Sequence, residues 1–67
     1  MGKVVKVIEV LSQSEKSWED AAQNAITEAG KSIKNIKSIY IQDKSAKIVK
    51  NKIVKYRITA KISFVIE

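Results

Sequence analysis

The chain has 67 residues and a formal net charge of +6, with 13 Lys and Arg against 7 Asp and Glu, and it contains no Cys and no His. This composition excludes disulfides, thiolate metal sites and imidazole ligands. A domain of this size buries only about 60% of the surface that its unfolded chain exposes, so we expect residues 1–67 to form one domain that is stabilised by association of several copies.

The sequence predicts neither a signal peptide nor a membrane span. Lys3, Lys6 and Glu9 interrupt the first apolar residues, and no run approaches the roughly 18 apolar residues that a span needs. We therefore expect a soluble cytoplasmic protein. The excess of positive charge lies after Gly30, which is compatible with phosphate, nucleotide or nucleic-acid ligands, although a solvated surface is the simpler interpretation.

The first predicted element is a strand over residues 3–11, which is rich in Val and Ile. Residues 12–17 are polar and are expected to end this strand. A helix follows, and two serines could cap its start. Ser14 could cap a helix that begins at Glu15, or Ser17 could form a capping box with Asp20 three residues later.

The helix is indicated by apolar residues at three- and four-residue steps from Trp18 to Ile33, most of them Ala. Such small side chains predict that the helix lies close to its sheet. Gly30 is a candidate end for the helix. The alternative is that the helix continues to Ile33, at a cost of about 1 kcal/mol for Gly relative to Ala.

Two further strands complete the predicted fold. Residues 36–48 place Ile39 and Ile41 on one face, with a bulge or a twist expected in the polar stretch 43–45. A turn is expected at 49–52, where Asn51 can best adopt positive φ. Residues 54–67 alternate most regularly, which predicts a central strand paired with both others. The result is an α+β fold of order β-α-β-β, with one helix packed on a three-stranded antiparallel sheet.

The sheet face away from the helix is the candidate functional surface, because a single helix covers only one side. Tyr and long cationic side chains can bury hydrocarbon while their polar tips stay in water, so this face suits a subunit interface with ligand pockets. An ordinary solvated face is the alternative. The residues assigned to it are Ser38, Tyr40, Arg57, Thr59, Lys61 and Ser63.

The sequence resembles the dodecin family over nearly its whole length. Residues 14–21, SEKSWEDA, resemble the family's SxxSWEEA helix start, and residues 31–36, KSIKNI, are similar to its KTVRNV-like helix end. Residues 56–64, YRITAKISF, resemble its YQVxLKVGF terminal strand. The order, spacing and total length of these segments make the resemblance specific, although no single motif is decisive.

The resemblance implies a hollow homododecamer of cubic symmetry that binds and buffers flavins such as riboflavin or FMN. In typical members a Trp early in the second strand stacks on the flavin ring, an Arg lies further along that strand, and a Gln of the third strand bonds the ring edge. Here these positions are Ser38, Ser45 and Arg57, so the chain looks like a member that lacks the stacking Trp. Tyr40, Thr59 and Lys61 are further candidates for the pocket lining, and Trp18 is expected to be a core or interface anchor.

These replacements predict weakened flavin binding. Stacking of a base on an aromatic side chain is worth about 1–3 kcal/mol, and Ser38 offers no aromatic face. Arg57 lacks an acceptor for a flavin N–H but can hold a phosphate or carboxylate, which makes coenzyme A or another nucleotide an alternative ligand. Calcium, held by Gln42, Asp43 and Glu67 from several copies, is a further alternative.

Two other classes of function are less favoured by the sequence. A nucleic-acid module would need an aromatic platform beside its basic residues, and here those residues are spread over both faces and the turns. An enzyme would need a nucleophile with an evident base, and the chain has neither His nor Cys to supply one. We therefore predict no catalytic residue and no metal site within one chain.

Overall fold

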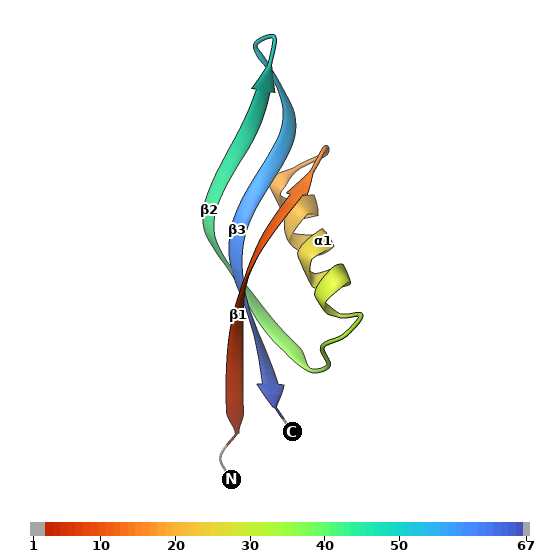
Figure 1. Cartoon of the computed structure of the whole chain (residues 1–67), viewed down its shortest axis with the longest axis vertical. Helices are drawn as coiled ribbons and strands as arrows, with labels where there is room; N and C mark the ends of the chain where they lie inside the picture. The colour runs from red at the N-terminus through yellow and green to blue at the C-terminus, as the bar shows by residue number, and fades with distance from the viewer. Residues whose placement is uncertain (1–2, 67) are drawn as a thin grey trace.

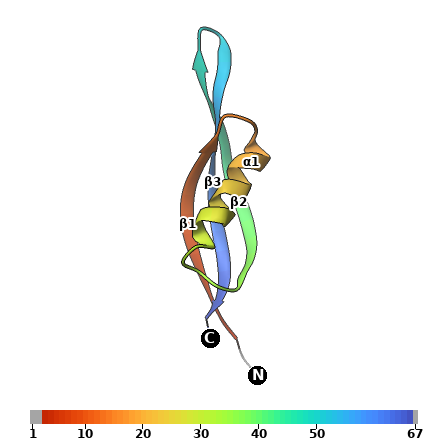
Figure 2. The ribbon, with the colours of Figure 1, turned by 90° about the vertical axis from the view of Figure 1, so that its right-hand side faces the viewer.

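The computed structural model describes residues 3–66. They form β1 (Val4–Ser14), α1 (Trp18–Ala29), β2 (Ile36–Val49) and β3 (Lys52–Ile66). β3 lies between β1 and β2 in one antiparallel sheet, and α1 packs on one side of that sheet (Figures 1 and 2). The predicted α+β fold and the central position of the last strand are confirmed.

The core between α1 and the sheet is built around small side chains. Ala21 of the helix and Ala60 of β3 are both completely buried, and Ile58 and Ile62 lie two residues to either side of Ala60 on the same face of β3. Because Ala projects only one carbon from the backbone, the helix can lie close to the strand beneath it. The Ala-rich stripe of the sequence predicted this arrangement.

Ser17 is the residue that caps the helix. Its Oγ accepts a hydrogen bond from the backbone N of Asp20 at 2.9 Å, which satisfies one of the free N–H groups of the first turn. The helix ends at Ala29, and the N–H of Gly30 donates to the oxygen of Ile26 at 2.8 Å. Of the two alternatives at each end, the structure selects the Ser17 cap and the stop at Gly30.

β1 is longer than predicted, which corrects the expectation that residues 12–17 leave the sheet. Ser12 and Ser14 still pair with β3. Their hydroxyls bond to the helix: Ser12 Oγ donates to the oxygen of Ala21 at 2.8 Å, and Ser14 Oγ donates to Oδ2 of Asp20 at 2.6 Å. Polar residues continue the strand here because the first turns of α1 supply their hydrogen-bond partners.

The β2–β3 pairing has three register shifts, at Ile36/Ser38, Ile41/Asp43 and Lys47/Ile48, and a tight turn at its end. The register shifts between Ile41 and Asp43, so Gln42 is the extra residue, slightly earlier than the predicted bulge. Lys50 and Asn51 have φ values of 51° and 64°, the two positive values that a two-residue type I′ hairpin turn requires. The predicted turn and the role of Asn51 are confirmed.

The molecule is long and thin, with extents of 54 × 20 × 13 Å. Its radius of gyration is 13.8 Å, whereas a compact domain of this length would have about 11 Å. The hairpin extends beyond α1 (Figure 1), and its apolar residues Ile48, Val49, Ile53 and Val54 are 38–56% exposed. Within residues 3–66, no helix is long and apolar enough to cross a membrane.

Candidate ligand-binding site

The open face, defined as the side of the sheet turned away from α1, is set out by the strand register. Its central row on β3 is Arg57, Thr59, Lys61 and Ser63. Their partners on β2 are Ser45, Asp43, Tyr40 and Ser38, and their partners on β1 are Gln13, Leu11, Glu9 and Val7. All the side chains that the sequence assigned to this face therefore share it, although they spread along its length.

Two large side chains of the open face lie mostly in water. Leu11 is 81% exposed and Tyr40 is 66% exposed. Tyr40 pairs with Lys61, which pairs on its other side with Glu9. An aromatic ring, a cation and an aliphatic side chain are thus available on one surface, and this combination can contact an amphipathic ligand or another subunit.

At the position where the resemblance places a stacking Trp, the structure has a polar pair. Ser38 and Ser63 face each other across β2 and β3, and their hydroxyls form a hydrogen bond. One hydroxyl donates to the other, and neither side chain provides an aromatic surface. This end of the open face therefore has no aromatic side chain on which a planar ring could stack.

Trp18 lies on the other side of the sheet and is a structural residue, as expected. Its Nε1 donates to the backbone oxygen of Ser45 at 2.9 Å. The edge of its ring meets Tyr56 with a centroid distance of 4.9 Å and an interplanar angle of 81°. These contacts hold the start of α1 against the sheet directly behind Ser45.

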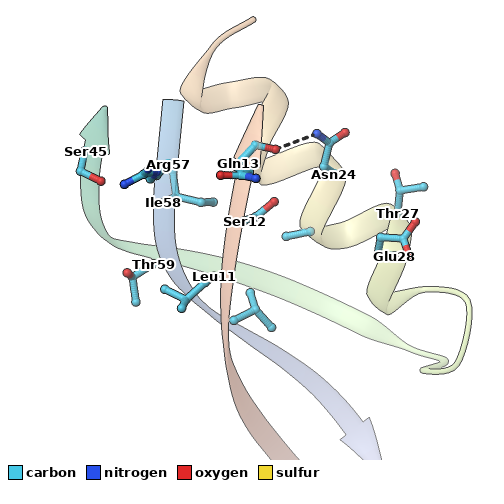
Figure 3. A pocket seen from close by; sticks show the side chains of 12 residues that line it. Leu11, Ser12, Gln13, Asn24, Thr27, Glu28, Ser45, Arg57, Ile58 and Thr59 are labelled. Carbon is cyan, nitrogen blue, oxygen red and sulfur yellow. Dashed lines mark hydrogen bonds between the residues drawn. The ribbon is translucent and has the colours of Figure 1, made fainter. Parts of the chain in front are cut away.

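A hollow of about 800 Å³ lies beside β1 and collects three of the candidate residues (Figure 3). Ser45, Arg57 and Thr59 line it, and the Arg57 side chain extends toward Ser45. The other candidates, Ser38, Tyr40 and Lys61, belong to the open face but not to this lining. The candidate residues thus form two groups, separated along the sheet.

Several lining residues were missed by the sequence reasoning. They are Val10, Leu11, Ser12, Gln13, Asn24, Ala25, Thr27, Glu28 and Ile58. Asn24 connects helix and strand, because its Nδ2 donates to the backbone oxygen of Gln13 at 3.2 Å. The β1 residues among them could have been found if the alternation of faces along β1 had been continued past Leu11. Residues 12–14 are polar, so the sequence was interpreted as leaving the strand there.

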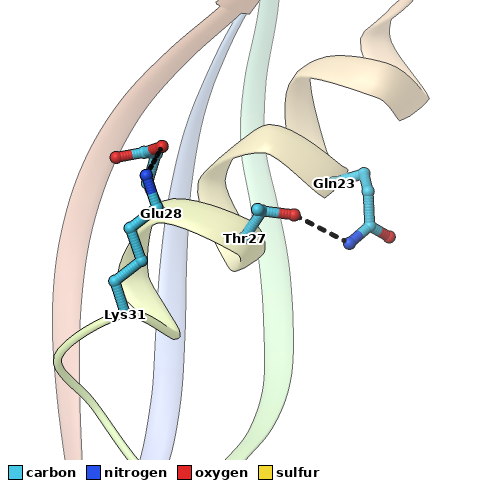
Figure 4. Close-up of polar contacts among 4 residues, drawn as sticks. All are labelled: Gln23, Thr27, Glu28 and Lys31. Carbon is cyan, nitrogen blue, oxygen red and sulfur yellow. Dashed lines mark hydrogen bonds and ion pairs between the residues drawn. The ribbon is translucent and has the colours of Figure 1, made fainter.

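The outer face of α1 adds polar groups at the rim of this hollow (Figure 4). Lys31 Nζ approaches Glu28 Oε2 to 2.8 Å, and Gln23 Nε2 donates to Thr27 Oγ1 at 3.3 Å. Both pairs are exposed to solvent. Glu28 and Arg57 both line the hollow, but they form no ion pair with each other within residues 3–66.

Within residues 3–66 of one chain, no three acidic side chains come together as a group that could hold a metal ion. Of the oxygen ligands considered for calcium, Gln42 is the bulge residue and Asp43 pairs with Thr59 on the open face. Glu67 lies outside the described residues. A hard cation would need oxygen ligands from several copies.

The family comparison agrees with this architecture, since the family model described as Dodecin matches residues 4–67. The chain belongs to the dodecin family. An arginine-to-alanine mutant of the dodecin of T. thermophilus superimposes with a TM-score of 0.94 at 26% identity, with 98% of each chain covered. No curated protein matches.

Two other solved dodecins extend the comparison. The dodecin from Streptomyces davaonensis has a TM-score of 0.94 at 16% identity, over 100% of this chain and 98% of its own, and it shows the shared fold. A protein of Mycobacterium tuberculosis described as a calcium dodecin has 30% identity and a TM-score of 0.82, over 96% of this chain and 91% of its own. Of these three solved structures, the one from Mycobacterium tuberculosis is described with a calcium-binding site.

Proposed function

We propose that this dodecin is a non-enzymatic small-ligand binding and storage protein that acts as a hollow homododecamer. The proposal is supported by the elongated shape of one chain and by the apolar side chains that it leaves in water. Leu11 and Tyr40 on the open face and Ile48 and Ile53 on the hairpin are all about half exposed or more. Neighbouring copies would cover these groups and enclose the pockets between them.

The ligand that we favour is a small anionic molecule bound near Arg57. The observation that carries this choice is the position of Arg57, which lies on the open face, extends toward Ser45 and has the neutral Gln13 on its other side. A guanidinium offers paired N–H donors that match phosphate and carboxylate oxygens. FMN, coenzyme A and other nucleotides carry such groups, whereas riboflavin does not.

Flavin binding of the usual dodecin kind is expected to be weak. Ser38 forms its hydrogen bond with Ser63 and presents no π surface. The missing stacking, at about 1–3 kcal/mol, corresponds to a loss of about 5- to 150-fold in affinity. Any flavin would therefore depend on its phosphate more than on its ring.

The test is a titration of the purified assembly with riboflavin, FMN and coenzyme A, after light scattering has established its size. We expect FMN and coenzyme A to bind more tightly than riboflavin, and Arg57→Gln to remove that difference. Lys34→Gln is the matched control, because it removes the same charge from an exposed residue of the loop before β2. Riboflavin binding as tight as FMN binding would contradict the anionic ligand, and a monomer that binds none of the three would refute the proposal.

Calcium is the second candidate, because a relative with 30% identity is described as a calcium dodecin. A calcium-dependent rise in melting temperature that Asp43→Asn abolishes would favour calcium over the anionic ligand.

Nucleic-acid binding is not supported by the open face. Among the positions described above, Tyr40 is its one exposed aromatic residue. We expect no retardation of single-stranded DNA at low salt.

A further inference from the structure

Three cations and one hydroxyl are adjacent on the open face near the hairpin end. The register pairs Lys47 with Lys55, and the next pair on the same side is Ser45 with Arg57. The intervening pair, Ala46 with Tyr56, lies on the helix side, where Tyr56 meets Trp18. We call the group Ser45, Lys47, Lys55 and Arg57 the basic square.

The dimensions of the basic square follow from sheet geometry. Cβ atoms of directly opposite residues are about 4.5–5.5 Å apart, and residues two apart on one strand are separated by about 6.6–6.8 Å. Lys and Arg side chains are longer than these separations. The three cationic side chains can therefore reach one tetrahedral anion placed above the square, and an anion that lies low over the Ser45 corner would also be within reach of its hydroxyl.

This arrangement is unfavourable without a partner, because like charges directly opposite each other in a sheet are destabilising. None of the three cations takes part in the ion pair found within residues 3–66, which joins Lys31 and Glu28. The nearest acidic residue of the open face, Asp43, pairs with Thr59 one step further along. β1 ends opposite Tyr56, so no third strand lies beside Lys55 to supply a carboxylate.

We propose that the basic square is a binding site for the phosphate or diphosphate group of a phosphorylated small molecule. Arg57 can offer a bidentate pair of donors, the two lysines add mobile positive charge, and the Ser45 hydroxyl supplies a neutral donor. This inference rests on the proposed function in taking the ligand to be an anion. It goes further in naming the group that is recognised and the side chains that recognise it.

The experiment uses inorganic pyrophosphate, which tests the square without a ring system. Binding to the purified assembly is measured by calorimetry at moderate salt, about 0.15 M, where interactions between exposed charges more than about 8 Å apart are largely screened. Titration with chloride at equal ionic strength is the reference. The double variant Lys47→Gln with Lys55→Gln should bind about 100-fold more weakly, since each charge-assisted contact contributes about tenfold. The control is Lys44→Gln with Lys52→Gln, which removes two charges from the same strands outside the square.

The control should retain affinity within about twofold, because general charge attraction is screened at moderate salt. Equal losses in both double variants would overturn the proposal, since charge alone would then explain binding. Absence of pyrophosphate binding to the unmodified protein would also overturn it. If pyrophosphate binds at the square but FMN and coenzyme A do not, the proposed function fails and the anion site stands.

A separate variant tests the claim that the square is destabilising when empty. Lys47→Glu converts a like-charged cross-strand pair into an opposite-charged one. We expect this variant to melt at a higher temperature than the unmodified protein without ligand, and to lose pyrophosphate binding. A lower melting temperature would contradict the claim, because the unmodified lysine pair would then be stabilising by itself.

Discussion

The indole Nε1 of Trp18 donates to the backbone oxygen of Ser45 at 2.9 Å, across 27 positions of sequence. This bond joins the first residue of α1 to β2 through the helix side of the sheet, while the Ser45 side chain belongs to the open face. Helix and candidate site lie on opposite faces and share this one strand position. The helix start therefore determines where one corner of the basic square lies.

Trp18→Phe should lower the free energy of unfolding by about 1 kcal/mol, because the ring is retained in part and the hydrogen bond is lost. Urea denaturation followed by far-UV circular dichroism, at one fixed protein concentration, measures this change. Tyr56→Phe is the control, since it keeps the ring that meets Trp18. Because Tyr56→Phe also leaves the bond to Ser45 intact, it should change stability by less than about 0.5 kcal/mol. A Trp18→Phe variant as stable as the unmodified protein would contradict the role assigned to this bond.

Ser17→Ala should cost about 1 kcal/mol of stability, since the N–H of Asp20 loses its capping oxygen. Ser17→Asp should retain most of the stability, because a carboxylate can accept the same bond and favours the helix N-terminus. Ser32→Ala in the exposed segment after the helix should change stability by less than about 0.5 kcal/mol. Thermal melts of the three variants measure these changes. A Ser17→Ala variant with an unchanged melting temperature would contradict the assignment of Ser17 as the cap.

Replacing Lys50-Asn51 by Asn-Gly should stabilise the hairpin by about 0.5–1 kcal/mol, because both positions have positive φ. Asn51→Val should have the opposite effect, since a β-branched residue resists this conformation. Melting temperatures at matched concentration measure both changes. A destabilising Asn-Gly turn would mean that the Lys50 side chain makes a stabilising contact in the assembly.

Ser38→Trp combined with Arg57→Gln should increase riboflavin affinity by about 5- to 150-fold, the equivalent of one aromatic stacking contact. The substitution breaks the hydrogen bond between Ser38 and Ser63, but Ser63 is only half-buried and can turn to water. Quenching of riboflavin fluorescence measures the gain, with Arg57→Gln alone as the control. If affinity does not rise, the ring site of this dodecin is not at Ser38.

Local patterns were sufficient to predict the elements and their order. The alternation around Ile58, Ala60 and Ile62 identified the buried face of the central strand, and the Ala-rich stripe identified the helix face. Both signals depend on residues near each other in sequence. The shared face of Ser38, Tyr40, Arg57, Thr59 and Lys61 followed from the same alternation, whereas their part in ligand binding stays a prediction.

The details that depend on contacts distant in sequence could not be predicted in this way. Ser12 remains in β1 because the oxygen of Ala21 accepts its hydroxyl, a partner that the local composition does not reveal. The pairing of Lys47 with Lys55 depends on the turn and on the register shift between Lys47 and Ile48, where Val54 is the extra residue. A shift of one residue would turn one lysine to the other face. The basic square was therefore visible only in the structure.

The projecting β2–β3 hairpin also has a consequence for the synthesis of this protein. α1 does not cover the hairpin's apolar residues, which are Ile48, Val49, Ile53 and Val54. In a newly made copy this apolar surface therefore stays exposed to water until another copy covers it. If copies associate as proposed, the yield of the assembly should depend on expression level, because proteases would remove copies that are too dilute to associate. A low concentration of copies is therefore the condition under which this chain should be degraded most.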